Sequence, residues 1–159
     1  MYKLLEDMSE ADKANLYQQV RDRLPDVLAA AKAKGWRPMS EEELAGFFTD
    51  EGRDEYGIRV AILDGGYCLL YTINETWWLK GAALIEQFLL GVQEDRDFKA
   101  AMEAMKELAA DIGCSTVHIG TAATSNKAYV RLLGRYGFTP QAVELVHTIG
   151  DQDGNRVKR

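Results

Sequence analysis

The sequence has few of the residues that hold metal ions or form disulfide frameworks. It contains two histidines and two cysteines, and their wide spacing gives no metal-ligand pattern. Cys68 and Cys114 both lie in apolar surroundings, so we expect reduced, buried thiols in a cytoplasmic protein rather than a disulfide or a nucleophile. The sequence therefore predicts no metal site.

An excess of positive charge is also missing, and so are long apolar runs. The net charge of −6 argues against a nucleic-acid surface, because such a surface needs a basic patch that displaces counterions. No stretch approaches the roughly 18 apolar residues that a membrane span needs. The first residues lack the basic and apolar regions of a signal peptide. We therefore expect a cytoplasmic protein whose partners include no nucleic acid and no membrane.

The 159 residues are enough for one domain with a substantial core, and the first fifty have helical patterns. Apolar residues at helical spacing over Leu16–Leu24 predict a first helix, which Pro25 is expected to end. A second helix is expected over Pro25–Lys34, because proline suits a first helical turn. The capping box Ser40–Glu43 predicts a third, short helix. Tyr2–Leu5 has the weaker pattern of a first strand.

The middle of the chain has the pattern of an antiparallel meander. The charged segment Asp50–Gly57 is expected to be a loop. Asp64-Gly65-Gly66 is typical of a hairpin turn, since such turns need positive φ, and alternating residues on either side predict strands at Ile58–Leu63 and Tyr67–Ile73. The apolar run Ala82–Val92 predicts the next strand.

Two adjacent tryptophans, Trp77 and Trp78, lie in the segment before that strand. They cannot both face one side of a strand. We expect one to pack in the core and the other either to pack there too, to line an acceptor pocket or to make a dimer contact.

The last third alternates between helical and strand patterns. A helix is expected over Arg96–Ile112, with an apolar face and Gly113 as its end. The β-branched segment Cys114–Thr124 predicts a strand, Ser125–Phe138 predicts a helix, and Ala142–Ile149 predicts a final strand. In the second helix Ser125 or Asn126 can cap the start, and glycine is the natural end.

This ending resembles the GNAT superfamily of N-acetyltransferases, in which a strand is followed by Asn and then by a helix ending in Gly-Phe. Here Gly137 follows Asn126 by eleven residues and Phe138 by twelve (137 − 126 and 138 − 126). The resemblance covers Ala82–Ile149 and extends more weakly to Tyr56–Ile73. Within that superfamily the sequence looks most like small phage-encoded members.

The resemblance implies a single α/β (α+β) domain over residues 1–159, with a mixed, mostly antiparallel sheet flanked by helices. Residues 1–50 would form an acceptor-side helical segment. Residues 56–149 would form the sheet core and the acetyl-CoA site, with the fourth and fifth strands parallel.

The resemblance also implies where acetyl-CoA would bind. Its pantetheine arm would bond to the backbone of the fourth strand, and its pyrophosphate would lie on the N-terminus of the next helix. The residues implied are Leu89, Leu90, Val92, Arg96, Phe98, Lys99, Ala101, Asn126 and Tyr129. Lys99 stands where the family has glycine. Either Lys99 supplies a charge to the pyrophosphate, or this is an ordinary acidic helix start, in which Asp97 and its acidic neighbours would repel a pyrophosphate. We expect weak binding of acetyl-CoA.

The catalytic residues are less well defined. The family tyrosine that protonates the leaving thiolate corresponds to Leu133, which has no proton to give. Tyr129 and Tyr136 lie one turn away on the same face, and each is also a good core aromatic. For the general base, Glu86 is the first candidate and His118 the second, although either residue can be structural.

Two functions follow from the resemblance. One is transfer of acetyl from acetyl-CoA to the amine of a small molecule or a protein, by direct attack in a ternary complex. The other is a catalytically inactive GNAT fold that binds a protein, as a phage accessory or inhibitor protein would. A homodimer is an open alternative for the oligomeric state.

Overall fold

The computed structural model describes residues 1–33, 38–48, 50–75, 80–120 and 127–140. Five strands form one sheet in the order β1-β2-β3-β4-β5. The strands are β1 (Tyr2–Leu4), β2 (Arg59–Leu63), β3 (Tyr67–Glu75), β4 (Ala82–Gly91) and β5 (Thr116–Ile119). The first four are antiparallel neighbours, and β4 and β5 are parallel. The predicted meander and the predicted parallel pair are confirmed.

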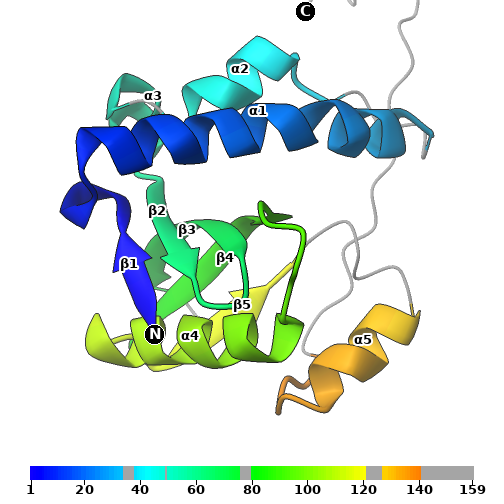
Figure 1. Ribbon diagram of the computed structural model, residues 1–159. Coiled ribbons are helices and arrows are strands. Elements are labelled where there is room, and N and C mark those ends of the chain that lie inside the picture. The colour runs from blue at the N-terminus through cyan, green and yellow to red at the C-terminus, as the bar shows by residue number, and fades with distance from the viewer. Residues whose placement is uncertain (34–37, 49, 76–79, 121–126, 141–159) are drawn as a thin grey trace, which may run out of the picture.

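Helices cover both faces of this sheet (Figure 1). The helices are α1 (Glu10–Ala33), α2 (Glu41–Gly46), α3 (Asp50–Tyr56), α4 (Phe98–Asp111) and α5 (Lys127–Gly134), and a 3-10 turn, η1 (Leu5–Asp7), follows β1. α1 crosses one face with α2 beside it, and α4 lies along the other. None of the helices in the described ranges is long and apolar enough to cross a bilayer.

The sheet separates two apolar clusters. The α4-side cluster joins the sheet to α4 and α5 and includes Leu69, Tyr71, Leu84, Met102, Met105, Leu108 and Leu133. The α1-side cluster joins the sheet to α1 and α2 and includes Leu16, Val20, Leu24, Cys68, Leu70, Leu90 and Val92. Because successive side chains of a strand point to opposite faces, each central strand contributes to both clusters.

The predicted break at Pro25 is wrong, because α1 continues through it to Ala33. Val20, Leu24 and Leu28 are buried on one face of α1, before and after the proline. A proline within a helix costs about 3 kcal/mol. Burial of each leucine contributes about 1.5–3 kcal/mol, so continuous packing against the sheet outweighs the local penalty.

The loop predicted at Asp50–Gly57 is also wrong, because most of it forms α3. The Tyr56 ring packs edge-on against Phe47 with 5.2 Å between ring centroids, and Gly57 follows with φ +62°. A tertiary contact and a glycine end therefore stabilise a helix in a segment whose composition is typical of a loop.

Other local predictions are confirmed. Ser40 and Glu43 form the predicted capping box at the start of α2. Gly65 and Gly66 both have positive φ in the β2–β3 turn. Gly137, with φ +85°, follows α5, where Phe138 N–H bonds to the Leu133 carbonyl as in a Schellman end. The tryptophan pair and the strand predicted at 142–149 lie outside the described residues.

Candidate functional site

The parallel pairing of β4 with β5 ends in the middle of β4. In the described residues the register runs from Ala83↔Thr116 to Glu86↔Ile119, while β4 continues to Gly91. The register of β4 against β3 shifts immediately after Glu86, so Gln87 is the extra residue of a β-bulge. Bulges re-aim side chains and are common beside active sites. The geometry therefore marks this point of β4 as a candidate site.

The Glu86 carboxyl group lies buried at this point, with only 4% of the residue exposed. Its Oε2 accepts a hydrogen bond from the Gly120 N–H at 3.3 Å, just past the end of β5. Its Oε1 accepts no hydrogen bond from the part of the chain that the structure describes. A buried oxygen without a donor is costly, so it suggests a group that interacts with a substrate or a water.

Burial raises the pKa of the Glu86 carboxyl group to about 7, because removal from water disfavours the charged form. The backbone N–H groups of Gly120 and Leu89 favour the ionised form and oppose part of this shift. A carboxyl group with a pKa near neutrality can accept and release a proton at physiological pH.

The structure does not bring Glu86 and His118 together. Glu86 is paired with Ile119, and His118 is paired with Ile85, so the two side chains belong to opposite faces of the sheet. Nε2 of His118 lies 3.3 Å from Oγ1 of Thr116. Of the two candidate bases, Glu86 is the buried one at the end of the strand pairing, and its Oε1 has no hydrogen-bond partner among the described residues.

The predicted residues of α5 pack on the α4 side of the sheet. Phe98 is the centre of an aromatic group, with ring centroids 5.9 Å from Tyr129 and 5.7 Å from Tyr136. Leu133 is buried in the α4-side cluster and 6% exposed. A phenol introduced there would meet core side chains. Asn126 lies outside the described residues.

The remaining residues that were predicted to bind acetyl-CoA lie at the end of β4 and the start of α4. Leu89 and Leu90 pair with β3 through Leu69 and Cys68. The N–H of Val92 already bonds to the Gly66 carbonyl at 2.9 Å. Ala101 is fully buried.

Two amides of the α4 N-terminus, where a pyrophosphate would bind, are occupied by the chain's own N-cap. The Asp97 carboxylate caps α4, with Oδ1 accepting from the N–H of Lys99 at 2.9 Å and of Ala100 at 3.1 Å. The Ala101 N–H bonds to the Asp97 carbonyl. Asp97 therefore caps α4, as expected for an ordinary acidic helix start, and the role of Lys99 stays a prediction.

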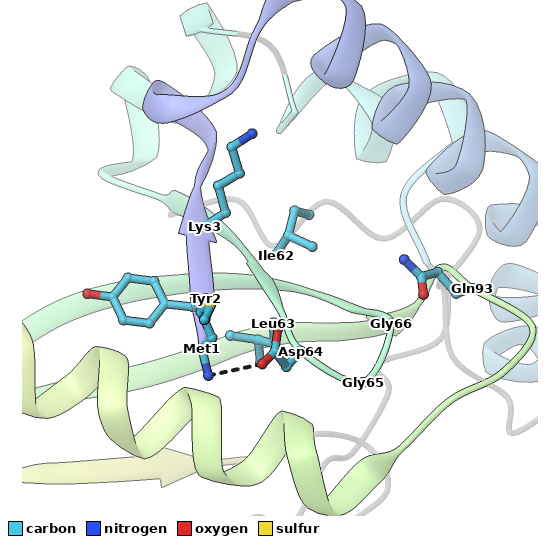
Figure 2. A pocket seen from close by; sticks show the side chains of 9 residues that line it. All are labelled: Met1, Tyr2, Lys3, Ile62, Leu63, Asp64, Gly65, Gly66 and Gln93. Atoms are coloured by element: carbon cyan, nitrogen blue, oxygen red, sulfur yellow. Dashed lines mark ion pairs between the residues drawn. The ribbon is translucent and has the colours of Figure 1, made fainter.

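Two cavities lie elsewhere in the described part of the chain, and none of the predicted catalytic residues lines them. One, of about 250 Å³, lies at the β1–β2 edge beside the β2–β3 turn (Figure 2). There the Met1 amine pairs with Asp64 Oδ2 at 3.1 Å, and also with Glu107. The other, of about 220 Å³, lies between α2 and α3 and is lined by Phe47, Tyr56, Glu43 and Glu55, among others.

Sequence reasoning missed three parts of this arrangement: the bulge at Gln87, the Gly120 N–H that bonds to Glu86, and the contact of the β2–β3 turn with the start of α4. The position of a bulge leaves no pattern in the nearby sequence. The same holds for a contact between backbone segments that are far apart along the chain. Asp97 could have been found, because aspartate just before an apolar helical pattern is a typical N-cap.

The fold is similar to that of solved acetyltransferases at low sequence identity. A possible acetyltransferase from Clostridium difficile 630 is 10% identical, with 94% of this chain and 97% of that chain covered and a TM-score of 0.58. A Trypanosoma brucei acetyltransferase is 12% identical, with 94% and 99% covered and a TM-score of 0.54. An integron cassette protein from Vibrio cholerae is 16% identical, with 95% and 93% covered and a TM-score of 0.60.

No protein-family model matches the sequence, and the search of curated proteins found no match. Identities this low show a shared fold. The predicted fold, a mixed and mostly antiparallel sheet with flanking helices, is therefore confirmed, and these solved acetyltransferases share it. The similarity to phage-encoded members stays a prediction.

Proposed function

We propose that the protein transfers an acetyl group from acetyl-CoA to an amine, with Glu86 as the general base. The observation that carries this proposal is the Glu86 carboxyl group itself. It is buried at the end of the β4–β5 pairing, beside a bulge, with one oxygen that lacks a donor among the described residues. The acetyltransferases with the same fold supply the reaction class.

In this reaction the amine nitrogen attacks the thioester carbonyl carbon. A C–N bond forms, the C–S bond breaks, and the thiolate leaves with the electron pair of the C–S bond. The ionised Glu86 carboxylate accepts the proton that the amine loses, directly or through a water. The pKa of about 7 suits this role, because the group is ionised at and above neutral pH and still basic enough to accept the proton.

The thiolate needs a proton when it leaves. Leu133, at the position of the family tyrosine, is buried and cannot donate one. Tyr129 and Tyr136 are the candidates for this acid, since both rings pack with Phe98 on the side of the sheet that Glu86 faces, and we propose Tyr129. Replacement of Tyr129 by Phe removes the hydroxyl group and keeps the ring against Phe98. This variant should lose turnover while keeping its fold.

The test is an acetyl-transfer assay with acetyl-CoA and a panel of small-molecule and peptide amines, in which the acetylated product is detected by mass spectrometry. Glu86→Gln should reduce kcat/KM by about 10²–10⁴-fold, the usual contribution of a positioned base. Glu75→Gln is the matched control, because Glu75 is an exposed glutamate at the far end of β3. Equal activity of the wild type and Glu86→Gln would refute the assigned base. Absence of turnover with every amine would instead favour a protein-binding function.

A further inference from the structure

The α4 N-terminus already holds a negatively charged group that belongs to the chain. Asp97 Oδ1 accepts the N–H of Lys99 and of Ala100, at 2.9 and 3.1 Å, and the Asp97 carbonyl accepts that of Ala101. The Lys99 and Ala100 N–H groups are two of the amides that would face an anion bound to the helix, whereas the Ala101 bond is the first one within the helix. The carboxylate and a donor's pyrophosphate would therefore compete for the same hydrogen bonds.

The β2–β3 turn fixes Asp97 in this place. The Gly65 carbonyl accepts the Asp97 N–H at 3.0 Å, and the Gly66 carbonyl accepts the N–H groups of Val92 and Gln93. A Cβ at Gly65 would collide with the Asp97 carbonyl oxygen, so the approach requires glycine. Figure 2 shows this turn reaching the chain at Gln93. The cap is therefore held by the tertiary structure and not by the helix alone.

The charges around this point do not favour a polyanion. Glu94, Asp95 and Asp97 carry three negative charges, and Arg96 and Lys99 carry two positive ones. The Arg96 side chain lies against the backbone of Gly91, at the end of β4. The segment therefore has a net negative charge where the two phosphates would approach.

We propose that the protein recognises its donor by the thioester and the pantetheine arm, so that it accepts acetyl-pantetheine about as well as acetyl-CoA. This inference rests on the proposed acetyl transfer. Beyond Glu86, β4 continues without β5 pairing in the described residues, which leaves backbone for an extended arm. The nucleotide end of CoA meets a helix start that Asp97 has capped.

Calorimetry with the intact protein tests the inference without relying on turnover. The probes are CoA, pantetheine, and adenosine 3′,5′-bisphosphate, which carries part of the nucleotide alone. CoA and pantetheine should bind within about threefold of each other. Two free helix amides holding a pyrophosphate would instead give CoA an advantage of about tenfold or more, since each hydrogen bond to a charged group contributes at least that factor. The bisphosphate should give no heat at millimolar concentration.

Variants of Asp97 and Asp95 separate the effect of the cap's hydrogen bonds from the effect of the negative charge around the helix start. Asp97→Gly opens the amides, and glycine is tolerated as an N-cap, so the helix should persist. It should strengthen CoA binding by about tenfold and leave pantetheine binding unchanged. Asp97→Asn keeps an acceptor oxygen on the amides, and Asp95→Asn removes a neighbouring charge without opening them. Both should raise the affinity for CoA less than Asp97→Gly does.

The outcomes distinguish this inference from the proposed function. Turnover with acetyl-CoA, together with CoA binding at least about tenfold tighter than pantetheine, would overturn the inference and leave acetyl transfer standing. Equal binding of the two thiols to a folded Asp97→Gly variant would overturn the role given to the Asp97 cap in this inference. Absence of binding and of turnover with either thioester would overturn the proposed function and the inference with it. Comparable kcat/KM for acetyl-CoA and acetyl-pantetheine would support both.

Discussion

Glu86 and Asp97 are carboxylates of consecutive elements, and their surroundings are opposite. Glu86 is buried on β4, accepts a hydrogen bond from the Gly120 N–H at 3.3 Å, and has an oxygen without a donor among the described residues. Asp97 is exposed and accepts two shorter backbone hydrogen bonds at the start of α4. The first arrangement leaves a proton acceptor available for chemistry, and the second uses the charge to complete a helix.

The difference shows that backbone donors decide the role of a carboxylate. A helix start presents several N–H groups to one side chain, so an aspartate there is satisfied by its own chain. The middle of a strand offers its N–H groups to neighbouring strands, so a buried glutamate is left with few donors. Four experiments test this contrast.

The largest effect should be on the pH dependence of catalysis. If Glu86 is the base, kcat/KM should fall about tenfold per pH unit below pH 7, and about a hundredfold by pH 5, because the protonated carboxyl group cannot accept a proton. Protonation of the amine acceptor also lowers kcat/KM as the pH falls. In pH–rate profiles, Glu86→Gln should keep the pH dependence caused by the amine and lose the part caused by Glu86. If the profiles of the wild type and of Glu86→Gln had the same shape, Glu86 would not be the base.

The next effect concerns stability. The folded-state pKa of Glu86 is raised from 4.5 to about 7, so the folded protein binds a proton that the unfolded chain has released. Stability should therefore fall as pH rises from about 4.5 to about 7, by about 3 kcal/mol from this group. Urea unfolding of wild type and Glu86→Gln should show the difference, with the variant more stable above pH 7. A constant difference across this range would mean that Glu86 is ionised throughout.

A smaller effect is expected at Gly65, which positions Asp97 and not Glu86. Gly65→Ala places a Cβ against the Asp97 carbonyl oxygen at φ +86°, and should cost about 1–3 kcal/mol or more in urea unfolding. Gly57→Ala is the matched control, since Gly57 has φ +62° and open space around it. The control should cost less, because it carries backbone strain without a collision. Equal costs would mean that the turn yields easily and that Asp97 is not held in place.

The smallest effect is expected at Asp97 itself. Asp97→Ala should reduce the free energy of unfolding by about 0.5–2 kcal/mol, and Asp97→Gly by a few tenths, as at other helix N-caps. This decrease in the free energy of unfolding is opposite to the increase expected for Glu86→Gln above pH 7. If Asp97→Ala were neutral in urea unfolding, the cap would contribute nothing, and the contrast between the two carboxylates would disappear.

Predictions based on local chemistry agree with the structure. The capping box at Ser40, the β2–β3 turn at Gly65 and Gly66, and the helix end at Gly137 follow from hydrogen bonds and φ angles within a few residues. The apolar runs also identified the strands of the meander. At the candidate site, Glu86 was the first candidate base, and an acidic start of the helix expected at Arg96–Ile112 was one of two interpretations. The roles of these residues stay predictions.

The sequence by itself determined the order of the described strands and the residues able to titrate, because these depend on neighbours along the chain. Only the tertiary structure decided that α1 continues through Pro25, since packing on the sheet outweighs the local cost. It also decided the surroundings of the two carboxylates. Glu86 is basic because the sheet removes it from water, and Asp97 is fixed because a turn some thirty residues earlier meets its backbone. Burial and contacts between distant segments arise only when the chain has folded, so no local pattern reports them.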